Sequence, residues 1–156
     1  MQNLDIYETN YGDSREILFL VFKKFFNQEN NLKISEIFNE ILSQISKEKN
    51  LAMEDYLNQI DDDFISQTMV GMLDNIDIIN DILQENGGQK FEFNFQIILK
   101  LIIFELNYLA ENSSQKIFNE YQEICQKYSL KFDSKLVINL INQLRNQRVK
   151  FRSNCK

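Results

Sequence analysis

The chain contains no proline and only four glycines among its 156 residues. Proline and glycine are the residues that most often interrupt helices and strands, so their scarcity favours helices joined by short connections. Two of the glycines, Gly87 and Gly88, are adjacent. They mark the best expected boundary between an N-terminal half and a C-terminal half. The sequence therefore predicts an all-α protein, which we expect to contain about six to seven helices.

Apolar periodicity places these helices along the chain. One expected helix has apolar side chains at the spacing of a one-sided amphipathic helix: Ile34, Ile37, Phe38, Ile41, Leu42 and Ile45. A second, over residues 93–110, is apolar on nearly all sides, which is typical of a buried central helix. A third is expected to run without a break through residues 64–83. Gly71 lies in its middle, where it would allow a neighbouring helix to approach closely.

The composition of the chain limits the classes of function that it can have. With 44% hydrophobic residues and a formal net charge of -6, the chain is expected to form a globular domain or two small subdomains. It has no histidine, no glycine-rich phosphate loop and no Cys-x-x-Cys spacing. These absences argue against an enzyme, a metal site or a cofactor. Asp61, Asp62 and Asp63 are better read as a helix cap with first-turn charge than as metal ligands.

The ends of the chain bear on its location. The N-terminus MQNLDIYETN lacks the apolar run of a signal peptide, and the apolar run IILKLIIF is too short to span a bilayer. Together with cysteine usage, this predicts a cytoplasmic protein with no membrane segment.

The last twelve residues hold five basic residues and no acid. They could contact RNA phosphates through Arg145, Arg148, Lys150 and Arg152, or simply complement the dipole at a helix C-terminus.

Three blocks of sequence in fixed order carry a resemblance. They are REILFLVF, then MVGMLDNIDIINDIL, then ILKLIIFELNYLAENSSQKIFNEYQEICQKY followed by DSKLVINLI. This order resembles the NusB family of bacterial transcription antitermination factors over about residues 14–145. The matching positions are Gly71, Phe104-Glu105-Leu106, Phe118-Asn119-Glu120, Asp133-Ser134 and Asn139. Each match is short, and their common register gives the resemblance its weight.

The resemblance implies a NusB-like helical bundle of two three-helix-like subdomains that is not an enzyme. We expect an N-terminal arm over residues 1–13, helical halves at 14–86 and 89–145, and a basic tail at 146–156. Relatives bind the boxA element of ribosomal RNA leaders with a small-subunit ribosomal protein, NusE in its transcription role. The relatives and this ribosomal protein are part of a complex that prevents RNA polymerase from terminating transcription. Relatives occur as monomers and dimers, so a homodimer is an open alternative here.

The resemblance also suggests which side chains contact RNA. Basic residues near the first helix and at the start of the last one would supply the surface, and the candidates are Arg15, Lys23, Lys24 and Lys135. However, no basic residue precedes Arg15, whereas relatives begin with several. Tyr121 and Leu140 stand where relatives have alanine and glycine. A second reading is therefore a protein-interaction module of the same fold that has lost specific RNA binding.

Several of these residues have a structural interpretation as well. Lys23 and Lys24 could occupy the solvent side of an amphipathic helix. Glu105, Asn119 and Glu120 could hydrogen-bond neighbouring loops. The aromatic side chains that could stack on bases could equally belong to the core; these are Tyr121, Tyr128 and Phe132.

Overall fold

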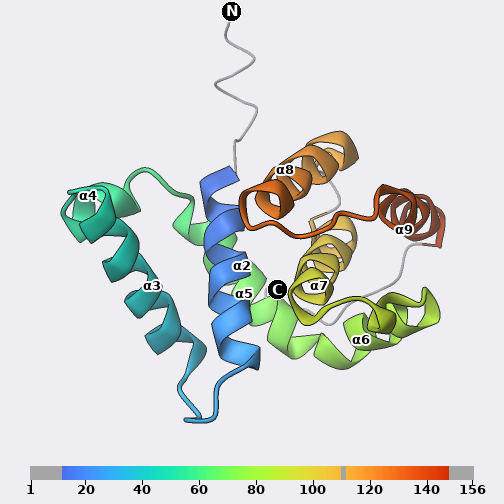
Figure 1. The fold of residues 1–156 in the computed structure, drawn as a ribbon, viewed down its shortest axis with the longest axis horizontal. Helices are drawn as coiled ribbons and strands as arrows, with labels where there is room; N and C mark the ends of the chain where they lie inside the picture. Colours follow the sequence, from blue (N-terminus) through green and yellow to red (C-terminus); the bar gives the residue numbers. More distant parts are fainter. Residues whose placement is uncertain (1–11, 110–111, 148–156) are drawn as a thin grey trace, which may run out of the picture. The chain divides into compact units, whose positions relative to one another are not determined.

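The structure is a computed structural model and describes residues 12–109 and 112–147 (Figure 1). These residues form helices and connecting segments, with no strand among them. The elements are α2 (Gly12–Phe26), α3 (Ile34–Glu48), α4 (Met53–Leu57), α5 (Asp62–Asp74), α6 (Ile76–Glu85), η1 (Gly88–Lys90), α7 (Phe93–Tyr108), α8 (Ser114–Lys127) and α9 (Ser134–Gln147). The all-α prediction is confirmed. The described part holds eight α-helices, because α4 is an extra short helix and one expected helix is divided.

The chain divides into two compact units, Met1–Ile65 and Ser66–Lys156. This division lies earlier than the boundary expected at Gly87 and Gly88. The glycine pair instead forms a tight turn within the second unit. Gly87 has a φ of 74°, and a Cβ on Gly88 would lie 2.2 Å from Cδ1 of Leu83. Gly88 is therefore packed against Leu83 of α6, and Gly87 supplies the left-handed conformation of the turn.

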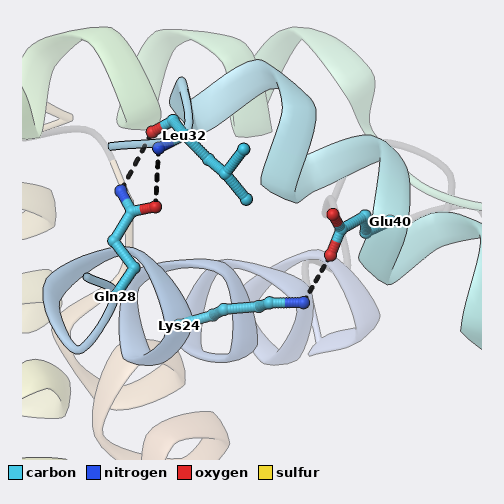
Figure 2. Close-up of polar contacts among 4 residues, drawn as sticks. All are labelled: Lys24, Gln28, Leu32 and Glu40. Atoms are coloured by element: carbon cyan, nitrogen blue, oxygen red, sulfur yellow. Dashed lines mark hydrogen bonds and ion pairs between the residues drawn. The ribbon is translucent and has the colours of Figure 1, made fainter. Parts of the chain in front are cut away.

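In the first unit, α2 and α3 pack as a helical hairpin. The apolar face expected for α3 is buried through Ile37, Ile41 and Leu42. At the turn, Nε2 of Gln28 donates to the Leu32 carbonyl (2.9 Å), and the Leu32 N–H donates to Oε1 of Gln28 (2.8 Å), as Figure 2 shows. Because one amide side chain fills both hydrogen-bonding roles, the turn is closed without a glycine.

In the second unit, α7 is the central helix and packs against α6, α8 and α9. Its residues 97–99 and 101–104 are all fully buried, as expected for a helix that is apolar on nearly every side. The close approach anticipated at Gly71 is present. A Cβ at this position would lie 2.4 Å from Cε1 of Phe104, so the aromatic ring occupies the space that any larger residue would need.

The expectation of one unbroken helix over residues 64–83 is wrong. The helix is interrupted at Asn75, which has φ −117° and ψ 18°. Both the backbone N–H of Asn75 and its side-chain Nδ2 donate to the Gly71 carbonyl, at 3.1 and 2.8 Å. A buried asparagine that bonds its own preceding turn competes with the regular helical pattern, and α6 starts afresh at Ile76.

Short polar side chains begin three of the helices. Asp61 Oδ1 accepts from the Phe64 N–H (2.9 Å), Ser113 Oγ from Lys116 (3.3 Å) and Asp133 Oδ1 from Leu136 (3.0 Å). Each bond satisfies an N–H that the first turn of a helix leaves open. The interpretation of Asp61, Asp62 and Asp63 as a helix cap with first-turn charge is therefore confirmed. The helices described in residues 12–109 and 112–147 include none long and apolar enough to cross a membrane.

Candidate nucleic-acid interface

Arg15, one of the four basic residues that the resemblance suggested for the RNA surface, is buried. Only 1% of it is exposed, and its guanidinium carbon lies 5.6 Å from the centre of the Phe64 ring. Arginine stacks well on aromatic faces because its planar cation is weakly hydrated. A phosphate cannot reach a side chain in this position, so the expectation that Arg15 contacts RNA is corrected. In this structure Arg15 of α2 packs against the ring of Phe64.

The neighbouring cations of α2 differ from each other. Lys24 is 43% exposed and forms an ion pair with Glu40 of α3 (Figure 2). Lys23 is partly exposed, and its Nζ lies 5.9 Å from the centre of the Phe19 ring. Both lysines therefore remain candidates for phosphate contact. Lys24 would first have to give up its carboxylate partner.

Lys135 lines a pocket in the second unit. The pocket has a volume of about 170 Å³ and is lined by Asn86, Lys90, Phe91, Asp133, Lys135, Leu136 and Asn139. It brings the turn after α6 to the start of α9. Three of the residues singled out in the sequence, Asp133, Lys135 and Asn139, are thus brought to one place.

The pocket combines charge, amides and an aromatic ring. Lys90 and Lys135 are exposed and supply positive charge, while Asn86 and Asn139 supply amide groups. Phe91 is partly exposed, and the Nζ of Lys90 lies 5.5 Å from its ring centre. Lysines suit RNA phosphates, and amides and aromatic rings suit unstacked bases. The arrangement fits a single-stranded nucleic acid better than a rigid duplex.

Lys90, Phe91 and Asn86 were missed in the sequence. Their only local signal is a lysine and an aromatic residue directly after the glycine turn, in the segment NGGQKF. That pattern is too common to single out. They lie close to Lys135 because α6 and α9 both pack against α7 in the second unit. Apolar periodicity alone does not reveal this tertiary arrangement.

The family-type residue Glu105 is buried in a polar network. It is 1% exposed, and its carboxylate accepts from the Tyr121 hydroxyl and from Nδ2 of Asn112, each at 3.1 Å. Arg145 extends the network: its Nε donates to Oγ of Ser114 and its Nη2 to the Asn112 carbonyl, both at 2.9 Å. The network joins α7, the start of α8 and α9.

Asn119 does not appear among these hydrogen-bonding partners of Glu105. It is exposed on α8, and its Oδ1 accepts from Nε2 of Gln115 at 3.1 Å. Glu120 is partly exposed. Tyr121, which stands where relatives have alanine, is buried and donates a hydrogen bond from its hydroxyl to Glu105. A departure from the family pattern is therefore part of the core of this chain.

The aromatic residues considered for base stacking are placed differently from one another. Tyr121 is fully buried, so it belongs to the core. Phe132 packs edge-on against Phe95 and Phe118, with ring centres 6.1 and 5.1 Å apart. Tyr128 is partly exposed, with Nζ of Lys127 5.8 Å from its ring centre.

The remaining sequence candidates are spread over α9 and the tail. Ser134 is exposed at the first position of α9. Arg145 is held by Ser114 and Asn112, so it serves the network around Glu105. Arg148, Lys150 and Arg152 lie outside the described residues, as do most of the expected N-terminal arm and Cys155. Among the described residues, no group of three or more acidic or cysteine side chains is placed to hold a metal ion.

Comparison with known proteins agrees with the resemblance seen in the sequence. The model of the NusB family matches residues 13–141, which is most of the chain. No curated protein and no solved structure matches.

Proposed function

Because this chain belongs to the NusB family, we propose that it is a transcription antitermination factor that binds boxA-type RNA of ribosomal RNA leaders. In this proposal it acts in the cytoplasm, together with a NusE-type small-subunit ribosomal protein, in a complex with RNA polymerase. The family match over residues 13–141 carries the proposal, since the family supports an antitermination or RNA-binding role generally. Binding to the boxA element and binding to the ribosomal protein are the more specific parts of the proposal, and experiment has to test them.

The pocket at the start of α9 supports RNA as the ligand. Lys90 and Lys135 would contact phosphates, which fix the position of the strand without reading its sequence. The ring of Phe91 and the amides of Asn86 and Asn139 would contact a base, and base contacts give specificity. Lys23 and Lys24 of α2 are proposed as a separate phosphate-binding element of the first unit.

Binding, and not catalysis, is the proposed activity. The NusB family is a family of non-enzymatic transcription factors. Within the described residues, the pocket offers lysines, amides and one aspartate. The carboxylate of Asp133 is engaged in capping α9 through the Leu136 N–H. This set suits recognition of a polyanion and provides no nucleophile with an adjacent base.

The alternative is a protein-interaction module of the same fold. Two observations favour it: the net charge of -6, which opposes binding to a polyanion, and the burial of Arg15. On this alternative the NusE-type protein would still bind, whereas the RNA would not. The two functions therefore differ in one measurable property, the binding of RNA.

Fluorescence anisotropy with a labelled single-stranded boxA-type RNA tests the proposal. The RNA is titrated with this protein alone and then with the NusE-type protein present. We expect sequence-selective binding that tightens with the partner. Failure of the RNA to bind in both titrations, while the ribosomal protein still binds, would establish the alternative. Loss of both interactions would overturn both functions.

The variant Lys135→Gln then tests the pocket. We expect it to weaken RNA binding several-fold, since it removes one phosphate contact. Lys131→Gln is the matched control, because Lys131 is exposed and close in sequence but does not line the pocket. Equal effects of the two substitutions would show that the pocket is not the site of contact.

A further inference from the structure

Lys24, a cation proposed to meet RNA, is paired with a carboxylate of the same unit. Its Nζ forms an ion pair with Oε1 of Glu40, and the two side chains are 43% and 46% exposed. Figure 2 shows Lys24 reaching from α2 to Glu40 on α3. Since both groups are open to solvent, an incoming phosphate could approach the same ammonium group that the carboxylate holds.

The surrounding helices hold the two charges opposite each other. The helices α2 and α3 pack against one another, and Gln28 and Leu32 close the turn between them with two hydrogen bonds. The carboxylate of Glu36 also accepts from the Lys33 N–H (2.9 Å) and fixes the start of α3. The pair therefore does not depend on its own weak attraction, and Glu40 stays near Lys24 as a tethered anion.

A tethered carboxylate competes with a free phosphate for the same cation. Exposed lysine–carboxylate pairs contribute little free energy, because both ions are well hydrated when apart. Breaking such a pair is therefore cheap, but it reduces the affinity of every RNA that uses Lys24. Among the other basic side chains of α2, Arg15 is buried and cannot offset this loss, and Lys23, which is partly exposed, remains as the second candidate cation of this helix.

We propose that Glu40 limits the affinity of the RNA-binding surface: it occupies Lys24 and so lowers phosphate-driven binding of RNA. This proposal rests on the proposed RNA-binding function and adds a role for a residue outside the family-type positions. Phosphate contacts are independent of sequence, so Glu40 lowers the affinity of cognate and non-cognate RNA alike. An RNA that also makes base contacts retains useful affinity, whereas one that depends on phosphates alone does not.

The test compares Glu40→Gln with a matched substitution on the same helix. Glu48→Gln makes the same change of charge at the exposed C-terminal end of α3, and the structure gives Glu48 no ion pair. Each variant is titrated with the boxA-type RNA and with a scrambled single strand of equal length, at several salt concentrations. Lys24→Gln and the double variant Lys24→Gln/Glu40→Gln complete a double-mutant cycle.

We expect Glu40→Gln to raise the affinity for both RNAs by about two-fold, toward the lower end of the range that an exposed ion pair spans. The effect of Glu48→Gln should be clearly smaller. Freeing one lysine should also steepen the slope of log affinity against log salt by about 0.7, the contribution of one phosphate contact on a single strand. In the Lys24→Gln background, Glu40→Gln should change the affinity no more than Glu48→Gln does.

Two results overturn the inference in different ways. If wild-type protein binds RNA but Glu40→Gln and Glu48→Gln act equally, Glu40 is only one of many surface charges. If Glu40→Gln still raises the affinity after Lys24 is removed, it does not act through Lys24. Absence of RNA binding by the wild-type protein, with and without the NusE-type protein, would instead defeat the proposed function itself.

Discussion

Two carboxylates show how differently the two compact units treat a charge on a helix. In Met1–Ile65, Glu40 is 46% exposed and meets a single lysine that is itself open to water. In Ser66–Lys156, Glu105 is 1% exposed and accepts hydrogen bonds from Tyr121 and Asn112. A buried carboxylate has lost its hydration, so it needs these donors, whereas an exposed one can exchange its partner for water or for another ion.

Because the two carboxylates differ in burial, we expect Glu105 to contribute to stability and Glu40 to contribute to binding. Removing the buried carboxylate should cost folding free energy because its donors are left without an acceptor. Removing the exposed one should leave the fold intact and change what the surface can bind. Substitutions at buried and at exposed polar groups test this contrast.

Glu105→Ala should lower the free energy of unfolding by about 3 kcal/mol. The Tyr121 hydroxyl would remain fully buried without its acceptor, and Asn112 would lose its contact with α7. Chemical denaturation followed by far-UV circular dichroism measures the loss. Glu105→Gln is the control, because it keeps one acceptor oxygen and should cost roughly half as much. A Glu105→Ala variant as stable as wild type would remove the contrast with Glu40.

Gly71→Ala should lower the free energy of unfolding by about 2 kcal/mol, although alanine is the better helix former. The new Cβ would lie 2.4 Å from the Phe104 ring. That ring is fully buried and stacks on Tyr108 with ring centres 4.8 Å apart, so it cannot simply move away. Combining the substitution with Phe104→Leu should recover part of the loss. If Gly71→Ala stabilises the protein, the packing between α5 and α7 is looser than the structure shows.

Alkaline pH should weaken both units, and the second one more. Burial raises the pKa of the Cys125 thiol from 9.0 to about 12, with a smaller contribution from Glu92. Burial likewise raises the pKa of Tyr56 from 10.0 to about 12, with smaller contributions from Asp13 and Glu16. Both folded groups keep their protons above the pKa of the unfolded chain. Their stabilisation is therefore complete below pH 9 and is lost as the pH rises through 12.

At pH 11 the loss from this source should be about 3 kcal/mol for the thiol and about 1 kcal/mol for the phenol. The measurement is the free energy of unfolding between pH 8 and 11. Cys125→Ala and Tyr56→Phe carry no titrating proton and should each flatten the curve by their share. A pH dependence that neither substitution changes would mean that other groups cause it.

Tyr121→Phe should cost about 1 kcal/mol, since it removes one buried hydrogen bond to Glu105 and keeps the ring. The same denaturation experiment detects it. In a Glu105→Ala background the substitution should cost much less, because the bond is already gone. Additive losses in the double variant would show that the two side chains act independently.

The elements of the fold followed from the sequence where one physical effect dominates. The helix α3 is apolar on one side, which predicts a helix with one face exposed to solvent. The helix α7 is apolar on nearly all sides, which predicts a buried central helix. In both cases the burial of apolar side chains decides the position of the helix. Asp61 stands where a helix needs an acceptor. Gly71 marked a close approach because nothing larger fits beside an aromatic ring.

The rest depended on which groups meet in three dimensions. The break at Asn75 depends on a side chain bonding Gly71, and apolar periodicity carries no sign of it. Arg15 looked like a surface cation because its place over Phe64 is a tertiary contact. The pocket joins Lys90 to Lys135, which are far apart in the chain. Charge and spacing identified some members of the site, and packing decided which of them are accessible.

Glu40→Gln should change the free energy of unfolding by less than about 0.5 kcal/mol, the smallest effect of the series. Lys24 would lose its partner, but both groups are exposed and water replaces the contact. Lys24→Gln should behave in the same way, and denaturation of the two variants beside Glu48→Gln measures it. A stable Glu40→Gln variant also allows any change in its RNA affinity to be assigned to the surface charge. A loss above about 1 kcal/mol would instead make Glu40 a structural residue like Glu105, and the exposed pair could no longer be read as exchangeable.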